Sequence, residues 1–440
     1  MASRELADRI CVKLQQSGHQ AYLVGGCVRD VLLGKNPSDY DISTDARPER
    51  VQELFPRSVA VGAKFGVILV VENGDEVEVA TFRSDIGYTD GRHPDHVVYA
   101  DSPQDDVRRR DFTINGLLMD PRTREVLDFV DGRADLRAGV VRAIGDPHVR
   151  FAEDKLRMMR AVRFAARFNF RIDPGTLAAA KLLAPQVTQV SPERIREELT
   201  KLLTEGAARR GFELLDETGL LQVVLPDIAR MKGVEQPPQY HPEGDVWIHT
   251  RMMLEKLQPN CSPTLAWGVL LHDVGKPATF SPATGPGTRI RFDGHAEVGT
   301  RMAERICREF RFSNDDTEQI GLLVANHMRF IDVRQMRQAT LKRFARLPRF
   351  EDHLELHRLD CLSSHGSLEA YDFVQQFLAN TPPEQVRPPR LVTGNDLKDM
   401  GISPGPRFKE ILLAVEEAQL DGQFSDRQAA LEFARSICQS

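Results

Sequence analysis

The sequence has few of the features that mark secreted or membrane-embedded proteins. Its 440 residues contain only six cysteines, and none of them forms a Cys-x-x-Cys pair, so we expect no disulfide framework and a reducing compartment. No apolar run approaches the ~20 residues that a membrane span needs, and the charged N-terminus lacks the pattern of a secretion signal. The net charge of −6 excludes a basic field over the whole surface. We therefore expect a cytoplasmic protein with no membrane partner, in which any nucleic-acid binding uses a local patch.

The chain is long enough for more than one domain. Its hydrophobic fraction of 41% and charged fraction of 28% are typical of globular proteins, and 440 residues exceed what one hydrophobic core usually serves. Strand and helix patterns alternate in the first third, helical periodicity dominates afterwards, and Pro-rich stretches interrupt the helical part. We predict four parts: a mixed α/β head at 1–145, a helical neck at 146–235, a helical block at 236–372 and a helical tail at 373–440.

A glycine turn and a pair of aspartates mark the head. A short strand ends at a Gly-Gly turn that includes Gly26, and Arg29 lies in the helical stretch that follows. The next strand, at 39–44, carries Asp39 and Asp41, which would point to the same face because side chains alternate along a strand. Two neighbouring carboxylates repel each other unless a cation lies between them, and Mg²⁺ that also holds phosphate oxygens satisfies both. Glycine at a helix N-terminus and an arginine fork both favour phosphate, so the pattern predicts nucleotide chemistry.

These motifs resemble the nucleotidyltransferase superfamily of DNA polymerase β type, and more closely its bacterial class II tRNA nucleotidyltransferases (CCA-adding enzymes) and poly(A) polymerases. Four further segments match motifs of that family in the same order, namely RRDFTING at 109–116, FVDGRADL at 129–136, EDKLRMMRAVRFAAR at 153–167 and SPERIREEL at 191–199. The resemblance implies a polymerase-β-like mixed sheet in the head. It also implies that Asp39 and Asp41 hold Mg²⁺ and act in catalysis, and that Gly26, Arg29 and the catalytic Arg110 hold the triphosphate.

Two positions in the head are less clearly assigned. Gly116 stands where the family usually has alanine, and we expect it to loosen a helix locally. Glu78 lies after the Asn73-Gly74 dipeptide, which predicts the tight turn of a hairpin. It is a candidate third carboxylate, and a solvent-facing strand residue is an equally good interpretation.

The start of the neck carries a candidate for selecting the nucleobase. Asp154, Arg157 and Arg160 recur at i, i+3 spacing and so would lie along one side of a helix. Cytosine and adenine share an exocyclic amino donor beside a ring-nitrogen acceptor, which guanine and uracil lack. A carboxylate only accepts and a guanidinium only donates, so Asp154 and Arg157 complement that edge and reject the other two bases. The resemblance adds Arg160 and Arg163 as nucleotide contacts, whereas composition alone fits a solvated basic helix equally well.

The segment at 82–99 is rich in glycine, aspartate and polar residues, which predicts a mobile loop. Similar loops in the family help to switch the pocket from C to A, and CC-adding enzymes tend to have shortened ones. Its full length therefore favours a complete CCA product.

Histidines and aspartates in the central block follow the spacing of a metal site. LAWGVLLHDVGKP reads as a buried apolar helix that ends in an imidazole–carboxylate pair, and burying that pair without a cation or hydrogen bonds is costly. The order of these residues resembles HD-domain metal-dependent phosphohydrolases. The resemblance implies a basic ligand set of His249, His272, Asp273 and Asp360, with His295 and His327 as the extra histidines of two-metal members. Mixed imidazole and carboxylate ligands suit Mn, Ni, Fe or Zn better than Mg.

Two later segments point toward RNA. Residues 331–350 hold six basic side chains and one acidic one, which fits contact with a tRNA backbone or a solvated helix face. The segment at 391–422 resembles the helical tail of CCA-adding enzymes, which poly(A) polymerases generally do not share.

The sequence thus predicts an α/β nucleotidyltransferase head followed by an all-α neck, an HD domain and a tail. The expected activity is template-independent addition of CCA to tRNA from CTP and ATP, with release of pyrophosphate, an added HD phosphatase or phosphodiesterase activity and no obligate protein partner. Alternatives are a poly(A) polymerase, a partial enzyme that adds only CC or only A, an HD phosphohydrolase whose head docks RNA, and a non-enzymatic tRNA-binding scaffold.

Overall fold

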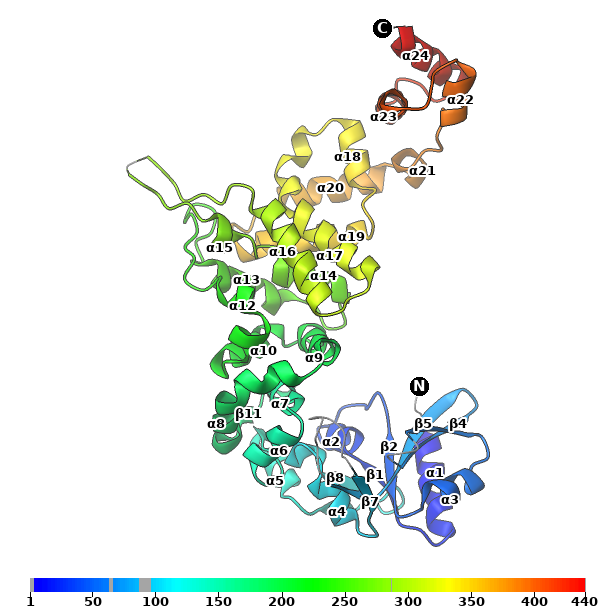
Figure 1. The fold of residues 1–440 in the computed structure, drawn as a ribbon, viewed down its shortest axis with the longest axis vertical. Helices are drawn as coiled ribbons and strands as arrows, with labels where there is room; N and C mark the ends of the chain where they lie inside the picture. The colour runs from blue at the N-terminus through cyan, green and yellow to red at the C-terminus, as the bar shows by residue number, and fades with distance from the viewer. Residues whose placement is uncertain (1–3, 63–65, 87–95, 286, 440) are drawn as a thin grey trace. The chain divides into compact units, whose positions relative to one another are not determined.

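The computed structural model describes residues 4–62, 66–86, 96–285 and 287–439 (Figure 1). The chain divides into two compact units, Met1–Ala229 and Arg230–Ser440. Among the described residues, no helix combines the length and apolarity that crossing a membrane requires. The four-part division with boundaries after residues 145, 235 and 372 remains a prediction.

A seven-stranded mixed sheet lies at the centre of the first unit, which confirms the expected fold of the head. Its strand order is β3-β4-β5-β2-β1-β8-β9. Strand β2 pairs antiparallel with β1 and parallel with β5, so it occupies an interior position. The strands are β1 (Ala21–Val24), β2 (Asp41–Thr44), β3 (Ser58–Gly62), β4 (Val67–Glu72), β5 (Asp75–Thr81), β8 (Leu117–Met119) and β9 (Val126–Asp128). Asn73 and Gly74 join β4 to β5 with positive φ angles of 55° and 87°, as the predicted hairpin requires.

Short helices surround this sheet. They are α1 (Arg4–Gln16), α2 (Gly26–Leu32), α3 (Pro48–Leu54), α4 (Pro103–Arg108), the 3₁₀ turn η2 (Thr113–Asn115) and α5 (Gly132–Ala138). A separate antiparallel ribbon consists of β6 (Arg83–Ile86) and β7 (His96–Tyr99). The prediction of a mobile, specificity-switching loop falls mainly on residues 87–95, which lie outside the described residues.

Gly116 does not lie inside a helix, so the prediction that it loosens one is wrong. It follows η2 at the point where the chain enters β8. A Cβ atom there would lie 2.9 Å from Val130 Cγ2 and 3.0 Å from Val107 Cγ1. Glycine fits this position because neighbouring side chains already fill the space.

Helices form the rest of the first unit. They are α6 (Pro147–Glu153), α7 (Leu156–Phe168), α8 (Pro174–Leu183), η3 (Ala184–Gln189), α9 (Pro192–Thr204), α10 (Ala208–Glu217), α11 (Leu220–Val224) and α12 (Pro226–Ala229). Two short strands, β10 (Val140–Val141) and β11 (Arg171–Ile172), pair in parallel beside them. Met158, Val162 and Ala165 of α7 are fully buried, as their helical spacing predicts.

Helices joined by loops make up the described part of the second unit. Its first helices are α13 (Val246–Lys256), α14 (Pro263–Leu271), α15 (Lys276–Thr279), α16 (His295–Glu309), α17 (Asn314–Asn326), η4 (His327–Gln335), α18 (Gln338–Phe344) and α19 (Phe350–Ser363). The remaining helices are α20 (Glu369–Asn380), α21 (Pro383–Val386), α22 (Gly394–Asp399), α23 (Pro406–Leu420) and α24 (Arg427–Gln439). The segment between α15 and α16 projects as a long arm (Figure 1), and a bridge between Ser281 and Arg291 joins its two sides.

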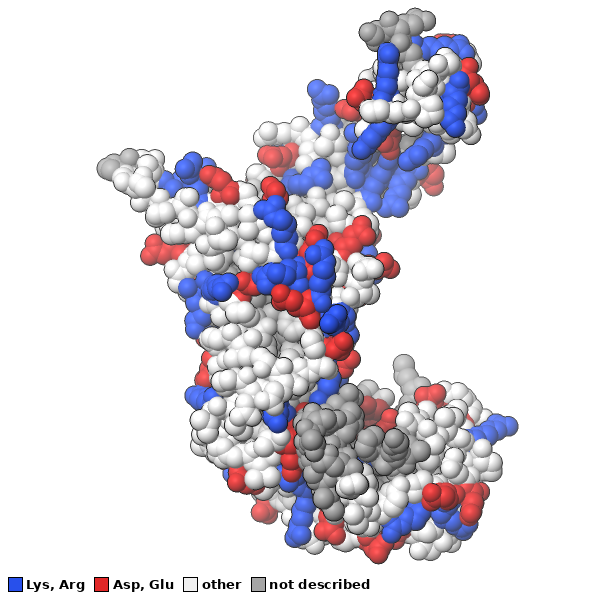
Figure 2. Space-filling model, viewed as in Figure 1, with Lys and Arg blue, Asp and Glu red and all other residues white. Residues whose placement is uncertain are grey.

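The basic segment at 331–350 holds the tail helix α23. Lys342 Nζ donates to the carbonyl oxygen of Leu420 at 2.8 Å, and Arg346 Nη1 donates to Glu416 Oε1 at 2.6 Å. Figure 2 shows blue and red side chains close together on parts of the visible face, most of which is white. Neither interpretation of this segment from the sequence anticipated an intramolecular partner.

Candidate active-site cleft and metal centre

A cleft of about 580 Å³ in the first unit gathers the predicted nucleotide-binding residues. The turn before α2, the start of β2, the segment after α4 and the beginning of α7 all contribute side chains to it. The predicted residues that line it are Gly26, Arg29, Asp39, Asp41, Arg110, Asp154, Arg157, Arg160 and Arg163. Residues more than a hundred positions apart in the sequence therefore face one space.

Three carboxylates lie close together at one end of β2. Asp41 opens the strand and stands across from Glu78 of β5 in the parallel register. Asp39 precedes the strand, so the expectation that both aspartates share one strand face is wrong, although both line the cleft. Surrounding protein atoms reduce the hydration of the Asp41 carboxylate, although this side chain still faces the cleft. This loss of water, followed by repulsion from Asp39 and Glu78, raises the pKa of Asp41 to about 6.

This donor set fits a magnesium ion. The positive charge of Arg110 offsets the repulsion among these carboxylates only in part, because the pKa of Asp41 is still raised. Clustered carboxylate oxygens are the ligands that Mg²⁺ prefers. The arrangement therefore agrees with the sequence prediction for Asp39 and Asp41, and the metal role of these residues remains a proposal.

Arg29 and Arg110 are fixed beside the glycine turn. Arg29 is buried, and it donates to Asp30 Oδ1 at 2.8 Å and to Asn115 Oδ1 at 2.6 Å. Arg110 Nη2 donates to Asp106 Oδ2 at 2.9 Å, while its buried Nε has no hydrogen-bond partner in the part of the chain that the structure describes. Two arginines held by carboxylates, one with a spare donor, can bind the phosphates of a nucleotide.

Asp154 and Arg157 are the pair predicted to recognise the base. Both line the cleft, but each forms its hydrogen bonds with residues outside the pair. Asp154 lies between α6 and α7 with an extended backbone, so it is not on the helix that carries Arg157 and that part of the prediction is wrong. Arg194 of α9 donates to Asp154 Oδ2 at 2.8 Å and to its Oδ1 at 3.3 Å. Arg157 donates to Glu153 Oε2 at 2.7 Å and to the carbonyl oxygen of Arg109 at 3.1 Å. The two side chains are thus oriented separately.

Arg160 and Arg163 are also held by carboxylates. Arg160 donates to Asp111 Oδ2 through Nε at 2.9 Å and through Nη2 at 2.6 Å. Although burial raises the pKa of Asp111, Arg160 and Asn115 hold it at about 2. Arg163 Nε donates to Glu198 Oε2 at 2.6 Å. These arginines form a rigid wall of the cleft.

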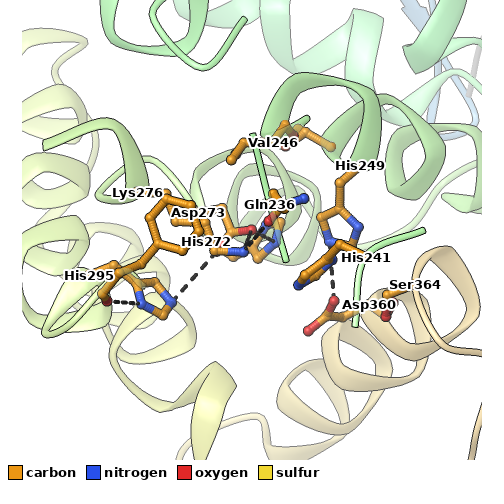
Figure 3. Close-up of polar contacts among 12 residues, drawn as sticks. Gln236, His241, Val246, His249, His272, Asp273, Lys276, His295, Asp360 and Ser364 are labelled. Atoms are coloured by element: carbon orange, nitrogen blue, oxygen red, sulfur yellow. Dashed lines mark hydrogen bonds and ion pairs between the residues drawn. The ribbon is translucent and has the colours of Figure 1, made fainter. Parts of the chain in front are cut away.

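The second unit brings all six predicted metal ligands into two adjacent groups. One consists of His249, His272 and Asp360 and the other of Asp273, His295 and His327, and within each group the ligand atoms lie within 4.8 Å of one another. Figure 3 shows His249 and Asp360 facing each other beside His272 and Asp273. Asp273 Oδ2 also lies 3.1 Å from His272 Nε2, so Asp273 stands between the groups. A cavity of about 730 Å³ opens beside them.

Backbone carbonyls fix the orientation of three imidazoles. Nδ1 of His272, His295 and His327 lies 2.8, 2.9 and 2.7 Å, respectively, from the carbonyl oxygen three residues earlier. The proton therefore resides on Nδ1, which leaves Nε2 as an acceptor. Nε2 of His249 lies 3.1 Å from Asp360 Oδ1, and Nε2 of His272 lies 3.1 Å from Asp273 Oδ2. Buried imidazole nitrogens gathered with carboxylate oxygens form the mixed ligand set that suits a transition metal, so these residues fit a metal ion.

The charge states of the second group suit metal binding. Burial lowers the pKa of His327 to about 4 and also lowers that of His295. The pKa of Asp273 lies well below its usual value because His272 and Lys276 outweigh the effect of burial. Neutral imidazoles beside an ionised carboxylate are the ligating forms at neutral pH.

Glu243 is a residue of this centre that sequence reasoning missed. Its Oε1 accepts hydrogen bonds from Nδ1 of His241 and from Nδ1 of His249, both at 2.8 Å. These bonds hold the pKa of Glu243 at about 2 even though burial raises it. The stretch that contains Glu243 was interpreted only as a Pro-rich interruption, although a His-Pro-Glu triplet before a buried helix was an available signal.

Gly275 allows the turn that carries Asp273 to touch the start of α16. A Cβ at this position would lie 2.2 Å from the carbonyl oxygen of His295 and 2.6 Å from the amide nitrogen of Gly299. Since both are backbone atoms, no side chain fits without displacing α16. This close approach brings Asp273 within 3.7 Å of His295 Nε2.

Three family models match the chain in order. The model of the poly A polymerase head domain matches residues 21–142, and that of the probable RNA and SrmB-binding site of polymerase A matches residues 169–232. The HD domain model matches residues 244–357. The matches therefore cover the head, much of the neck and the metal-ligand region.

Curated relatives and solved structures extend the similarity to nearly the whole chain. A CCA-adding enzyme of Levilactobacillus brevis is 33% identical over 430 residues, which are 97% of this chain and 96% of the relative. One of Leuconostoc citreum is 30% identical, covering 98% of this chain and 96% of the relative. The crystal structure of the Bacillus stearothermophilus CCA-adding enzyme in complex with CTP matches with a TM-score of 0.76 and 27% identity, covering 99% of this chain and 98% of the other.

Proposed function

Because this chain belongs to the CCA-adding enzymes, whose head domain is that of the poly(A) polymerases, we propose that it adds C, C and A to the 3′ end of tRNA from CTP and ATP and releases pyrophosphate. The observation that carries this proposal is the single cleft in which a carboxylate cluster, two phosphate-binding arginines and a carboxylate–guanidinium pair face one another. Relatives of this family have been solved with CTP, with ATP and with tRNA.

Mg²⁺ is the proposed cofactor of the head, with Asp39 and Asp41 as its ligands and Glu78 as a third carboxylate nearby. Mg²⁺ in such a site neutralises phosphate charge and lowers the pKa of a coordinated hydroxyl. The 3′-hydroxyl of tRNA loses its proton to solvent as its oxygen forms a bond to the α-phosphorus, the bond from that phosphorus to the bridging oxygen breaks, and pyrophosphate leaves. Arg29 and Arg110 neutralise the triphosphate.

Gly26 contributes through its backbone rather than through a side chain. It is the first residue of α2, and a Cβ built on it would lie 3.6 Å from Arg29 Nη2. The absence of a side chain leaves the turn open to phosphate, which a helix N-terminus favours.

Base selection is proposed to rest on Asp154 and Arg157, with Arg160 and Arg163 as nucleotide contacts. The two oxygens of Asp154 accept one bond from a backbone amide and two from Arg194. A carboxylate offers about four acceptor positions, so about one remains for the exocyclic amine of cytosine or adenine. Arg194 therefore acts as a positioning residue that aims this acceptor.

The product of the reaction tests this proposal. We expect tRNA lacking its 3′ CCA to gain CCA when CTP and ATP are supplied together, and to gain little from GTP or UTP. A long ladder of A residues would instead identify a poly(A) polymerase, and a stop after CC or after one A would identify a partial enzyme. Equal incorporation of UTP and CTP would contradict the assignment of Asp154 and Arg157.

The HD region supports a second activity, which we propose to be phosphohydrolysis at the cavity in the second unit. The supporting observation is that Asp273 stands between two groups of buried metal ligands. Mn, Ni, Fe or Zn bound there would lower the pKa of a coordinated water. Phosphate monoesters and 2′,3′-cyclic phosphates at RNA 3′ ends are the proposed substrates.

Paired variants separate the two activities and exclude the rivals. Asp39→Ala should abolish nucleotide addition and leave phosphatase activity, whereas His272→Ala should do the reverse. If Asp39→Ala still extends tRNA, the metal assignment in the head is wrong. A wild type that adds no nucleotide and has a phosphatase activity that only His272→Ala abolishes would favour an HD phosphohydrolase whose head docks RNA, and no activity in the wild type would favour a scaffold.

The proposed compartment is the cytoplasm. The five cysteines whose side chains the structure describes are free thiols, and four of them, Cys11, Cys27, Cys307 and Cys361, are buried. Unpaired buried cysteines suit a reducing environment.

A further inference from the structure

The sheet of the head has one open face, and part of that face is apolar. Along β4, Ile68 and Val70 are buried, whereas the residues that alternate with them, Val67, Leu69 and Val71, are half-buried and point the other way. The open face of an antiparallel sheet usually carries polar side chains. Apolar side chains that gather on such a face are typical of an interaction site.

The strand register places this apolar surface in one row with a proposed metal ligand. Asp41 of β2 pairs with Glu78 of β5, and Glu78 pairs with Leu69 of β4. Leu69 pairs in turn with Val59 of the edge strand β3, which is 58% exposed. Directly paired residues point to the same face, and strands lie about 4.8 Å apart, so Leu69 is about 10 Å and Val59 about 14 Å from Asp41. Val59 and the three half-buried residues of β4 are called the apolar platform below.

The apolar platform lies on the side of β2 from which the attacking oxygen has to come. Gly26 and Arg29 follow β1, and β1 pairs with β2 on the side opposite β5. Arg110 Nη1 stands beside the same turn, 3.1 Å from the position that a Cβ of Gly25 would take. Since these groups are proposed to hold the triphosphate, pyrophosphate leaves on the β1 side. Attacking and leaving oxygens lie roughly in line through the phosphorus, so the attacking nucleotide lies on the β5 side, toward the platform.

The chemistry of the apolar platform suits the flat face of a base rather than a phosphate. None of its four residues is charged, and the exposed acids beside it, Glu76 and Glu78, repel phosphate groups. Aliphatic side chains pack against the face of any base and form no hydrogen bonds with it, so they do not select a sequence. An enzyme that extends a 3′ end whose last base changes from step to step requires such tolerance.

We propose that the apolar platform packs against the unpaired terminal nucleotides of the tRNA acceptor strand and thereby positions the 3′-hydroxyl that attacks the α-phosphorus. This inference rests on the proposed nucleotide addition and names the surface that receives the RNA end. The incoming CTP or ATP lies on the other side of β2, so the platform affects the binding of tRNA and not that of the nucleotide.

Threonine substitutions remove apolar area from the platform and retain a residue that strands favour. We expect Val59→Thr and Leu69→Thr each to raise KM for tRNA lacking CCA about three- to tenfold, while KM for CTP stays within about twofold of the wild-type value. Leu182→Gln is a matched control, since Leu182 of α8 is 68% exposed and lies outside the cleft. Equal Tm values would show that the variants fold, and a general defect of the head would raise KM for CTP as well.

A photocrosslink locates the RNA end independently of turnover. A tRNA that lacks CCA and ends in 4-thiouridine should crosslink to a peptide from β3 or β4 when it is irradiated with the full-length protein. If both variants keep KM for tRNA within about twofold of that of Leu182→Gln, the platform is refuted while CCA addition stands, and a partner protein becomes the occupant to seek. If the wild type adds no nucleotide, the proposed function fails, and the crosslink decides: a peptide from β3 or β4 supports the platform, and crosslinks confined to other segments refute it.

Discussion

Glu243→Gln is expected to weaken metal binding in the HD region while the second unit stays folded. Glu243 is almost fully buried, and its Oε1 accepts one hydrogen bond from Nδ1 of His241 and another from Nδ1 of His249. A carboxylate that holds Nδ1 of a metal-binding histidine fixes the ring and makes its other nitrogen a stronger ligand. Glutamine has nearly the same shape but no charge.

The size of the effect follows from these two bonds. A hydrogen bond to a charged group contributes about 1.5–3 kcal/mol and a neutral one about 0.5–1.5 kcal/mol, so neutralising Glu243 weakens each bond by about 1 kcal/mol. In addition, Glu243 Oε2 is buried without a partner among the described residues, and the glutamine amide would leave a donor unsatisfied there. We expect the Kd for Zn²⁺ or Mn²⁺ to rise about tenfold to a hundredfold.

A competition titration against a fluorescent chelator measures this Kd on protein stripped of metal. Glu309→Gln is the matched control, because Glu309 lies on α16 and is exposed at 59%. Equal Tm values for the metal-free proteins and unchanged CCA addition would show that the fold is intact. A Kd for Glu243→Gln within about twofold of that for Glu309→Gln would refute the reasoning.

Three further predictions concern the rest of the chain. Asp41→Asn should lower kcat for CTP addition by about a hundredfold or more without changing phosphatase activity, and single-turnover kinetics would check this. Arg194→Ala should reduce the preference for CTP over UTP by about tenfold, because Asp154 loses the bonds that aim it; unchanged selectivity in competition assays would contradict this. Burial, assisted by Arg329, lowers the pKa of His353 to about 4, so the folded state binds fewer protons than the unfolded state between pH 4 and pH 6.5. The free energy of unfolding should fall by about 2 kcal/mol from pH 7 to pH 5 through this group, and urea titrations of His353→Leu at both pH values should lose that part of the decrease.

Local order in the sequence predicted the helices and strands well, and it placed the candidate metal ligands on or beside helices. The strand, Gly-Gly turn and helix at the start of the head follow directly from residue type, and the hairpin follows from Asn73-Gly74. All six HD ligand candidates lie on helices or at their ends. These features depend on neighbours in the chain, which a sequence shows.

Partners that are distant in the chain could not be predicted in the same way. Asp154 was assigned to a continuous helix because its spacing fits one, but its side chain accepts a hydrogen bond from the backbone amide of Leu156 and pairs with Arg194, 40 residues away. Arg346 belongs to the segment interpreted as either a tRNA contact or a solvated helix face, whereas Glu416, 70 residues later, binds it. Spacing gives the side of a helix on which a charge lies, but not which opposite charge folding will bring to it.

The contact at Gly275 holds the two groups of candidate metal ligands in the HD region next to each other, although Gly275 is not itself a candidate ligand. Any larger residue there would push α16 outward and carry His295 away from Asp273, while His249, His272 and Asp360 could stay in place. A single substitution would therefore disperse the group of Asp273, His295 and His327 and leave the group of His249, His272 and Asp360 assembled. Counting ligand residues in a related sequence would not reveal that change, since every ligand would still be present.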